Sequence, residues 1–167
     1  MGKINFKPGN MLYPLPVVMV SSADKDGKPN IITIAWTGTI CSDPAMVSIS
    51  VRKERYSHKL ISESGEFVIN LTTKDLVYAT DFCGVKSGKD IDKFKACKLT
   101  PIKGEYVKAP MISESPVNIE CRVKEIKEEK CRSHSENGEK ALGFMLGIAA
   151  SLRNEKGEER KGGAPDH

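Results

Sequence analysis

The sequence predicts a mainly β domain, a small β-barrel with helical insertions. Short runs of apolar, β-branched residues recur between turn signals, and two of these runs alternate apolar and polar residues with a period of two. Few segments have the pattern of a helix, and this balance favours a barrel over a layered α/β fold. A length of 167 residues is typical of one domain.

The first three strands are predicted in the N-terminal third of the chain. Val17–Ser22 and Ile31–Trp36 are apolar and β-branched, and Asp24–Gly27 between them is a turn signal, so the pair is expected to form a hairpin. Asp43-Pro44 marks the next turn. Met46–Val51 then alternates apolar residues with serines, which predicts a third strand with one face in a core.

Two helices and a fourth strand are expected next. Tyr56–Ser64 is predicted as a short helix that ends at Gly65, and Phe67–Leu71 as a strand. Thr72–Asp75 is expected to open a second helix, because its first hydroxyl and its carboxylate three residues later can both accept bonds from free backbone N–H groups. Gly84 would end that helix.

The rest of the domain is predicted as a loop, a short helix and a strand. Ser87–Phe94 is interpreted as a loop that leads into a short helix, and Pro116–Ile126 shows the clearest strand alternation of the chain. The sequence thus divides into a domain over residues 1–126 and a polar C-terminal tail over residues 127–167. Within the tail only Ala141–Leu152 is apolar, which favours disorder by composition.

Composition excludes several function classes. Hydrophobic residues make up 39% and charged residues 29%, as in a globular protein. The net charge of +4 is too mild and too scattered for a nucleic-acid groove, yet it suits a small anionic ligand. No apolar run approaches the roughly 20 residues of a membrane span, and no secretory segment is recognisable. We therefore expect a cytoplasmic protein with neither nucleic-acid nor membrane partners.

The cysteines and histidines do not indicate a metal site. The five cysteines include no Cys-x-x-Cys pair, so reduced thiols are expected rather than a zinc site or a disulfide framework. The three histidines have no ligand spacing. No Gly-x-Gly-x-x-Gly follows a strand, and Gly84–Asp90 is only superficially similar to a phosphate loop, being one residue short with Asp90 in place of Ser or Thr.

A cluster of hydroxyl and guanidinium groups follows the third predicted strand. Ser50, Arg52, Arg55, Tyr56 and Ser57 lie within eight positions. A phosphomonoester carries a charge of about −1.5 to −2 near neutral pH, and its oxygens need charge-assisted donors such as arginine. The cluster therefore favours a phosphate site. The alternative interpretation is a solvated strand end with ordinary surface arginines.

A second candidate segment could hold a flat ring. Thr33–Gly38 contains a small residue, the only tryptophan of the chain and a glycine. Backbone N–H groups of an irregular strand can bond the polar edge of a heteroaromatic ring while side chains cover its face. Trp36 could instead be a core or interface anchor. Together with the phosphate cluster, the segment predicts a site for flavin mononucleotide (FMN), which would supply the redox chemistry.

At these residues the chain resembles the flavin reductase-like family with the FMN-binding split barrel, in particular its flavoredoxin-type branch. The resemblance extends from residue 11 to about residue 126 and rests on Tyr13-Pro-Leu-Pro-Val, Asp26-Gly-Lys-Pro-Asn, Thr33-Ile-Ala-Trp-Thr-Gly, Asp43-Pro-Ala-Met-Val-Ser-Ile-Ser-Val-Arg, Tyr56-Ser-His, Gly65-Glu-Phe-Val-Ile-Asn-Leu, Phe82-Cys-Gly-x-x-Ser-Gly, Asp92-Lys-Phe and Ala109-Pro-Met-Ile followed by Pro116-Val-Asn-Ile-Glu-Cys.

The resemblance implies a homodimer with FMN near the subunit interface. It implies cofactor contacts, by backbone or side chain, from Thr33, Ile34, Ala35, Trp36, Thr37, Ser50, Val51, Arg52, Tyr56, Ser57 and Lys93. It names no catalytic acid or base. Electrons would come from NADH, NADPH or a redox partner, and would pass from FMN to a flavin, a ferric chelate or a small redox protein. Alternatives are a non-catalytic FMN-binding module or a degraded dimerising paralogue.

The C-terminal tail departs from the resemblance. Members of the family usually continue past the equivalent of Ser133-His134 with an aspartate and a further barrel strand, whereas this chain continues with Ser135-Glu-Asn-Gly-Glu-Lys. A shifted reading frame near residues 127–135 is therefore a second interpretation of the tail, beside disorder. It would remove the C-terminal strand of the split barrel. Sequencing of the coding DNA tests it, because an intact frame without a family-like product in another frame would exclude a shift.

Overall fold

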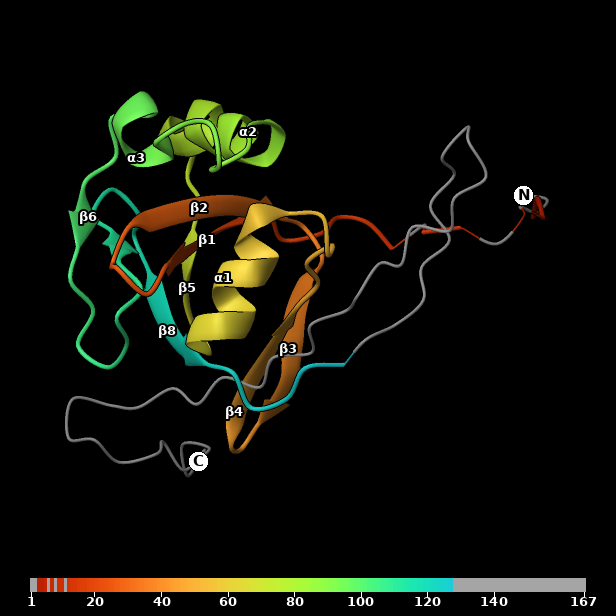
Figure 1. Ribbon diagram of the computed structural model, residues 1–167. Coiled ribbons are helices and arrows are strands. Elements are labelled where there is room, and N and C mark those ends of the chain that lie inside the picture. Colours follow the sequence, from red (N-terminus) through yellow and green to blue (C-terminus); the bar gives the residue numbers. More distant parts are fainter. Residues whose placement is uncertain (1–2, 6, 8, 11, 128–167) are drawn as a thin grey trace, which may run out of the picture.

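The computed structural model describes residues 3–5, 7, 9–10 and 12–127 of the chain. Its main sheet has four antiparallel strands in the order β2-β1-β5-β8 (Figure 1): β1 (Val18–Ala23), β2 (Pro29–Ile34), β5 (Glu66–Leu71) and β8 (Asn118–Arg122). Within the described residues, β2 and β8 are thus the edges of this sheet. The predicted tail lies outside the described residues except for Lys127.

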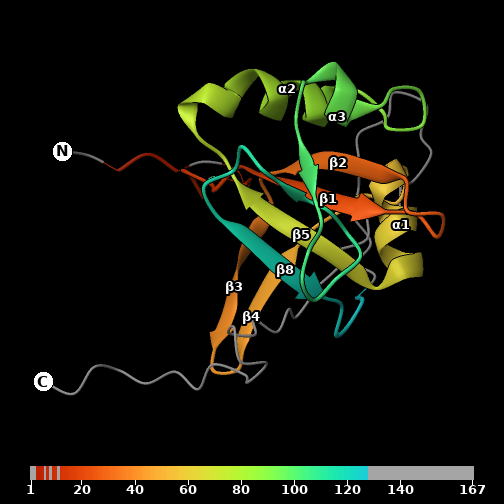
Figure 2. The same cartoon turned by 90° about the vertical axis from the view of Figure 1, so that its left-hand side faces the viewer.

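A separate hairpin extends away from the main sheet, as Figures 1 and 2 show. It consists of β3 (Thr37–Ser42) and β4 (Ala45–Ile49), which pair with each other. The sheets do not close into a continuous barrel among the described residues. The predicted mainly β architecture, a split barrel with helical insertions, is confirmed.

The predicted strand Ile31–Trp36 is wrong at its end. β2 stops at Ile34, and β3 begins at Thr37 after a two-residue corner. The carbonyl of Trp36 accepts a hydrogen bond of 2.8 Å from the Ser50 backbone N–H, which extends the pairing of β3 with β4 to the corner. The chain leaves the main sheet at this corner, so residues of the single apolar run Ile31–Trp36 contribute to two different sheets.

The hairpin of β1 and β2 is confirmed, and its turn follows the predicted chemistry. Asp24 Oδ1 accepts bonds of 3.0 and 2.8 Å from the N–H groups of Asp26 and Lys28. Gly27 has a φ of 81°, a conformation that glycine adopts without a steric penalty. The turn thereby sets the register in which Ser22 lies opposite Asn30.

The two faces of β1 and β2 are covered by different helices, because neighbouring side chains of a strand point to opposite faces. One cluster packs α1 (Tyr56–Ser64) through Ile61 against Val20 and Ile32. The other packs α2 (Val77–Val85) and α3 (Lys93–Ala96) against Met19 and Ile31. Burial on both faces explains why every residue of β1 is buried.

The helix predicted at residues 56–64 is confirmed with its bounds, and Gly65 ends it with a φ of 67°. The second helix differs from its prediction. It begins as a 3₁₀ turn, η1 (Lys74–Leu76), and α2 continues through Gly84 to Val85. Thr72 does not cap it, because its hydroxyl donates instead to the Val17 carbonyl at 2.8 Å.

A buried asparagine joins the sheet to the short pair β6 (Pro101–Ile102) and β7 (Met111–Ile112). Asn70 is fully buried in β5, and its Nδ2 donates to the Met19 carbonyl at 3.0 Å. Its Oδ1 accepts from the Ile112 N–H at 3.0 Å and from Asn118 Nδ2 at 2.8 Å. In the part of the chain that the structure describes, no helix has the length and apolar character of a membrane span.

Candidate functional site

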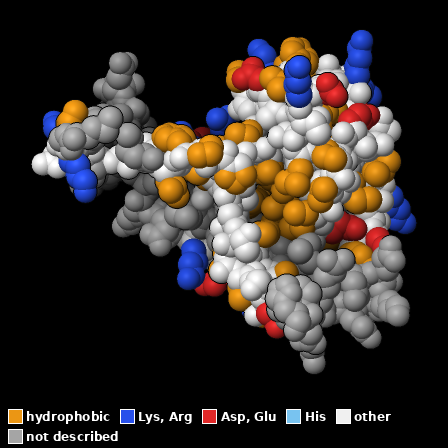
Figure 3. Space-filling view, turned by 180° about the vertical axis from the view of Figure 1, so that it is seen from behind, with side chains coloured by type: hydrophobic (Ala, Val, Ile, Leu, Met, Phe, Trp, Pro, Cys, Tyr) orange, Lys and Arg blue, Asp and Glu red, His pale blue; other side chains and the backbone are white. Residues whose placement is uncertain are grey.

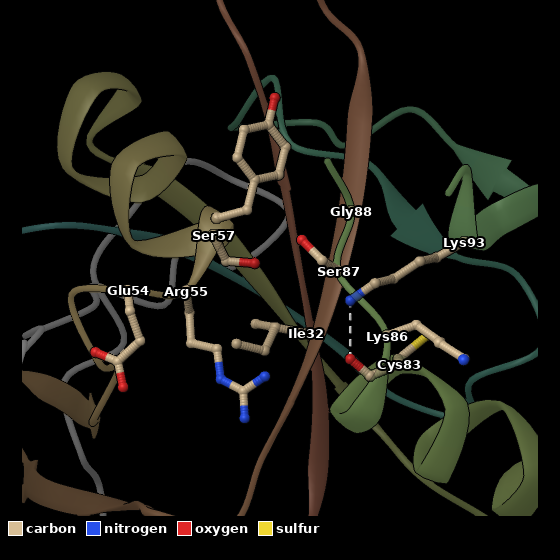
Figure 4. Close-up of a pocket in the computed structure, with 10 residues that line it drawn as sticks. Ile32, Glu54, Arg55, Ser57, Cys83, Lys86, Ser87, Gly88 and Lys93 are labelled. Carbon is tan, nitrogen blue, oxygen red and sulfur yellow. Dashed lines mark hydrogen bonds between the residues drawn. The ribbon is translucent and has the colours of Figure 1, made fainter. Parts of the chain in front are cut away.

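A pocket of about 300 Å³ lies where the helices on opposite faces of the sheet approach each other beside β2. Since β2 is an edge strand, one wall comes from the start of α1 and the other from the end of α2 and the loop that follows it (Figure 4). Its lining residues are Ile32, Glu54, Arg55, Tyr56, Ser57, Cys83, Lys86, Ser87, Gly88 and Lys93.

The first wall is the N-terminus of α1. Arg55 is the N-cap residue, and its side chain makes no capping bond. The first turn of a helix has backbone N–H groups without intrahelical partners, and the helix dipole adds positive potential there. Tyr56 and Ser57, which line the pocket, are the first two residues of this turn. The wall therefore has the donors and the potential that bind an anion.

Ser57 is held in place from the sheet. Its Oγ accepts a hydrogen bond of 2.6 Å from Asn30 Nδ2, and both residues are buried. Since the Asn30 bond occupies an acceptor position of the hydroxyl, the Ser57 proton is left for another acceptor. Asn30 Oδ1 is buried without a hydrogen-bond partner. It faces Gly88, where an added Cβ would overlap Oδ1 and lie 2.7 Å from Asn30 Cγ.

The second wall contains a buried lysine. Lys93 is 4% exposed, and its Nζ donates to the carbonyls of Ile31 at 2.6 Å and Cys83 at 2.8 Å. The first of these bonds satisfies a carbonyl of the edge strand, and the second joins α3 to α2. An ammonium group has three donors, so one N–H of Lys93 is left for a ligand.

The charge of Lys93 is only partly compensated. Burial lowers the pKa of Lys93 from its ordinary value of 10.5, and the positive charge of Arg55 lowers it further. Two carbonyl dipoles do not neutralise an ammonium group, whereas a bound anion would favour its protonated form. The pocket therefore combines a buried cation with a helix N-terminus and the exposed cations of Arg55 and Lys86.

The sequence-predicted site residues do not all meet in this pocket. Tyr56, Ser57 and Lys93 line it. The side chains of Ile34 and Val51 are buried in the apolar core next to α1, so only their backbone is left to contact a ligand. Others lie outside the pocket lining and are partly buried: Thr33, Ala35, Thr37 and Ser50.

Trp36 and Arg52 are both exposed and outside the pocket lining. Trp36 is 47% exposed at the corner between β2 and β3. Arg52 points its guanidinium toward Glu54 at 3.9 Å, with 65% of its side chain exposed. Arg55, three positions later, is the arginine of this cluster that lines the pocket.

Sequence reasoning missed one wall of the pocket. Lys86, Ser87 and Gly88 line it, and Asn30 supports it. A signal was present in the Gly84–Asp90 segment, whose small residues and lysines resemble a phosphate loop only superficially. The segment reaches the site because α2 and α3 anchor it at both ends, an arrangement that local sequence does not reveal.

A second hollow of about 400 Å³ lies on the outer side of α2, next to Thr33. Its walls include Val17, Thr72, Val77 and Val85, and three of these residues are among the exposed apolar side chains of the described chain. Figure 3 shows that apolar side chains gather across one face of the molecule. Contiguous apolar surface of this kind marks sites of protein or ligand contact.

The pocket next to α1 fits a phosphomonoester. Hydroxyl, ammonium and guanidinium groups surround it, and Gly88 allows the backbone to approach closely. Among the described residues, no group of three His, Cys, Asp or Glu side chains is arranged to hold a metal ion.

Comparisons with known proteins agree with this arrangement of strands and helices. The family described as "Flavin reductase like domain" matches residues 10–157. The match extends past residue 126, where the sequence analysis places the end of the domain. An uncharacterised protein of Archaeoglobus fulgidus is 32% identical over 155 residues, which cover 93% of this chain and 80% of the relative.

Two solved structures are similar along most of the chain. The flavoredoxin of Desulfovibrio vulgaris (Miyazaki F) has a TM-score of 0.74 and 30% identity, with 95% of this chain and 83% of the other covered. The flavoredoxin from Methanosarcina acetivorans has a TM-score of 0.69 and 29% identity, with 96% and 82% covered. The matched family, the Archaeoglobus relative and these structures together show that the chain belongs to the flavin reductase-like family.

Proposed function

We propose that this protein is a flavin-dependent oxidoreductase that binds FMN, with the phosphate in the pocket between α1 and the α2–α3 loop. The observation that carries the proposal is the convergence of Ser57, Lys93 and Arg55 on one small pocket at a helix N-terminus. Membership of the flavin reductase-like family and similarity to two flavoredoxins support it.

The phosphate end of the ligand would be held by complementary charge. Lys93 supplies a cation with one free N–H, Arg55 a forked guanidinium and Ser57 an oriented hydroxyl. The N–H groups of the first turn of α1 add further donors.

The ring would lie along the corner between β2 and β3. The backbone from Thr33 to Thr37 would bond its polar edge, and the exposed Trp36 indole would cover an apolar part of the ring. FMN, when bound, supplies the capacity to accept and release one or two electrons. The role of this protein is to bind the phosphate, orient the ring and keep water away from the ring.

We infer that NADH, NADPH or a redox partner is the electron donor, and that a flavin, a ferric chelate or a small redox protein is the electron acceptor.

The exposed apolar side chains favour a homodimer. Val77, Tyr78 and Val85 on α2 are each more than 60% exposed, which is unusual for large apolar residues. A second copy of the chain would cover such side chains and exclude water from a ring bound near Trp36. We therefore propose that the ring site is completed at a subunit interface.

Titration of the purified protein with FMN tests the proposed function. We expect a stoichiometric complex that is yellow, and anaerobic NADH or NADPH, or a chemically reduced redox protein, should bleach it. Riboflavin is the matched control, because it has the same ring without the phosphate and should bind at least tenfold more weakly. A folded protein without measurable FMN affinity would exclude the proposal. Binding without turnover by any donor would identify a passive FMN-binding module.

A further inference from the structure

The hollow on the outer side of α2, called the α2 hollow from here on, has one wall made by a single helix face. Its volume is about 400 Å³. The α2 residues that line it are spaced by three and four positions, which places side chains on one side of a helix: Val77, Thr80, Asp81, Gly84 and Val85. Other chain segments supply the rest of the lining, which is Val17, Thr33, Thr72 and Thr73.

Internal contacts hold the two sides of the α2 hollow in place. α2 lies over the edge strand β2 (Figure 1), and it approaches so closely that a Cβ at Gly84 would lie 3.3 Å from Thr33 Cβ. The Thr33 hydroxyl donates to the Thr80 carbonyl of α2. On the other side, the Thr72 hydroxyl donates to the Val17 carbonyl at 2.8 Å. The hollow is therefore formed before any ligand arrives, as small-molecule sites usually are.

The threonine hydroxyls of the lining have already used their protons. Besides those of Thr33 and Thr72, the Thr80 hydroxyl donates to the Leu76 carbonyl at 2.7 Å. A hydroxyl group has one proton and two acceptor lone pairs, so each of these three can only accept a further hydrogen bond. The lining therefore favours a ligand that brings its own N–H or O–H donors.

The charge of the α2 hollow is opposite to that of the pocket next to α1. Among the described residues that line the hollow, Asp81 alone is charged, and its carboxylate takes part in none of the ion pairs of the described chain. The last turn of α2 contains no basic residue, so the negative end of the helix dipole adds to this charge. The pocket next to α1 instead contains Arg55, Lys86 and Lys93 against Glu54.

We propose that the α2 hollow binds a small organic cation, a primary ammonium group on a compact apolar body. The ammonium group has three donors and no acceptor, which matches the Asp81 carboxylate and the threonine oxygens. The apolar body contacts Val17, Val77 and Val85, which are exposed in the single chain and lose contact with water when a ligand covers them. An anion of the same shape is rejected by Asp81.

This inference does not rest on the proposed function, because the α2 hollow is formed without a flavin. Thr33 also belongs to the segment proposed to hold the FMN ring, so the cation would lie beside that ring. Val77 and Val85 belong to the surface proposed for a second copy of the chain. A copy that filled the hollow would exclude the cation, so a binding experiment distinguishes the two occupants.

The test is an NMR titration of the full, ¹⁵N-labelled chain at pH 7 without added flavin. The probe is benzylammonium, and the matched ligands are benzyl alcohol, which is neutral, and benzoate, which is an anion. We expect benzylammonium at millimolar concentrations to shift the amide signals of Thr80, Asp81, Gly84 and Val85. Benzyl alcohol should bind more weakly, and benzoate should leave these signals unchanged.

Three variants assign the binding to the α2 hollow. Asp81→Asn should raise the dissociation constant for benzylammonium about two- to fivefold, the effect expected of an exposed ion pair. Asp75→Asn is the matched control, because Asp75 is an exposed carboxylate in η1 outside the lining, and it should change nothing. Val85→Lys should abolish binding by adding a positive charge to the wall, and a lysine at a helix C-terminus favours the helix.

Several results would overturn the proposal. These are the absence of shifts at α2, equal binding of benzylammonium and benzyl alcohol, and shifts confined to the pocket next to α1. Equal dissociation constants for Asp81→Asn and Asp75→Asn would overturn it as well. If Val85→Lys folds poorly, the comparison of Asp81→Asn with Asp75→Asn decides alone. FMN binding is measured separately, so a failure here leaves the proposed function standing.

Discussion

Asn30 Nδ2 donates a hydrogen bond of 2.6 Å to Ser57 Oγ, which joins the edge strand β2 to the first turn of α1. The two residues are 27 positions apart in the sequence, and both are buried. Through this bond the sheet orients the hydroxyl that we place against a phosphate. Four predictions concern the pocket that this bond helps to build, and one concerns the stability of the sheet.

Replacement of Asn30 by Ala should weaken FMN binding although Asn30 does not line the pocket. The Ser57 hydroxyl would lose its fixed orientation, and the net loss of a hydrogen bond to an anion is about 1.5–3 kcal/mol at most. We expect the dissociation constant for FMN to rise about three- to tenfold, measured by fluorescence quenching. Ser57→Ala should have a similar effect, and the double variant should be little worse than either. Fully additive effects would contradict the coupling.

The Gly88→Ala substitution should disrupt the pocket. A Cβ at this position would overlap Asn30 Oδ1, a buried atom that α1 and β2 hold in place, so either the loop or Asn30 must move. We expect a loss of FMN affinity of tenfold or more in a titration. Gly9→Ala is the matched control, since the nearest atom to the Cβ that it adds is the Lys7 carbonyl oxygen at 3.9 Å. Equal affinities of the two variants would show that the close approach at Gly88 is unimportant.

The two arginines of the predicted cluster should differ in their effect on FMN binding. Arg55 lines the pocket, whereas Arg52 lies beside Glu54 at 3.9 Å on the surface. Arg55→Ala should cost about 1.5–3 kcal/mol of FMN binding, the usual range for a hydrogen bond to a charged group. Arg52→Ala should cost less than about 0.5 kcal/mol, as surface substitutions usually do. Isothermal titration calorimetry of each variant with FMN and with riboflavin measures these losses of binding free energy. A larger loss for Arg52→Ala than for Arg55→Ala would show that Arg52, rather than Arg55, contacts the phosphate.

Lys93 should make FMN binding and apo-protein stability respond to alkaline pH in opposite directions. Its pKa is lowered in the folded protein, mainly by burial, so between that pKa and 10.5 the unfolded chain binds more protons than the folded one. The contribution of Lys93 to the free energy of unfolding therefore rises with pH in that window. FMN affinity should fall there, because the neutral amine no longer attracts phosphate.

The difference between wild type and Lys93→Met isolates these effects from other titrating groups. Urea unfolding and FMN titration at a series of pH values from 7 to 10.5 provide the two readouts. Riboflavin, without a phosphate, should show little of the pH dependence assigned to Lys93. Parallel pH profiles of wild type and Lys93→Met would contradict a lowered pKa at this residue.

Asn70→Ala should destabilise the fold independently of the site. The substitution leaves the buried Ile112 N–H without its acceptor and removes one of the two acceptors of the Asn118 amide. Each such loss costs about 1–3 kcal/mol, so we expect the free energy of unfolding to fall by about 2–4 kcal/mol in urea. Thr39→Ala, at an exposed residue of β3, should change it by less than about 0.5 kcal/mol. A loss below 1 kcal/mol would show that water replaces these bonds.

Local chemistry was sufficient to predict several elements from the sequence. The helix Tyr56–Ser64 and its end at Gly65 agree with the structure because apolar spacing and a glycine terminus act within one element. The same holds for the hairpin of β1 and β2, whose turn is stabilised by the Asp24 carboxylate. Pattern and propensity agree in these segments, so no distant contact is needed to select the conformation.

Distant contacts decided the elements that the sequence misplaced. Ile34 and Trp36 belong to one apolar run, yet the chain leaves the main sheet after Ile34 because β3 pairs with β4 rather than with β1. Thr72 has the pattern of a helix cap, but the Val17 carbonyl of the neighbouring chain segment is the acceptor that its hydroxyl contacts. Long-range pairing outweighs a local preference of a few tenths of a kcal/mol to about 1 kcal/mol.

By itself the sequence predicted a mainly β domain, the family resemblance, and a candidate phosphate cluster that includes Tyr56, Ser57 and, through the resemblance, Lys93. Only the tertiary structure decided that Arg55 lines the pocket, that the Gly88 loop forms its second wall and that Asn30 orients Ser57. The physical reason is that the pocket lies at a sheet edge, where helices from opposite faces approach each other. Such proximity depends on packing across the whole sheet, which no local pattern encodes.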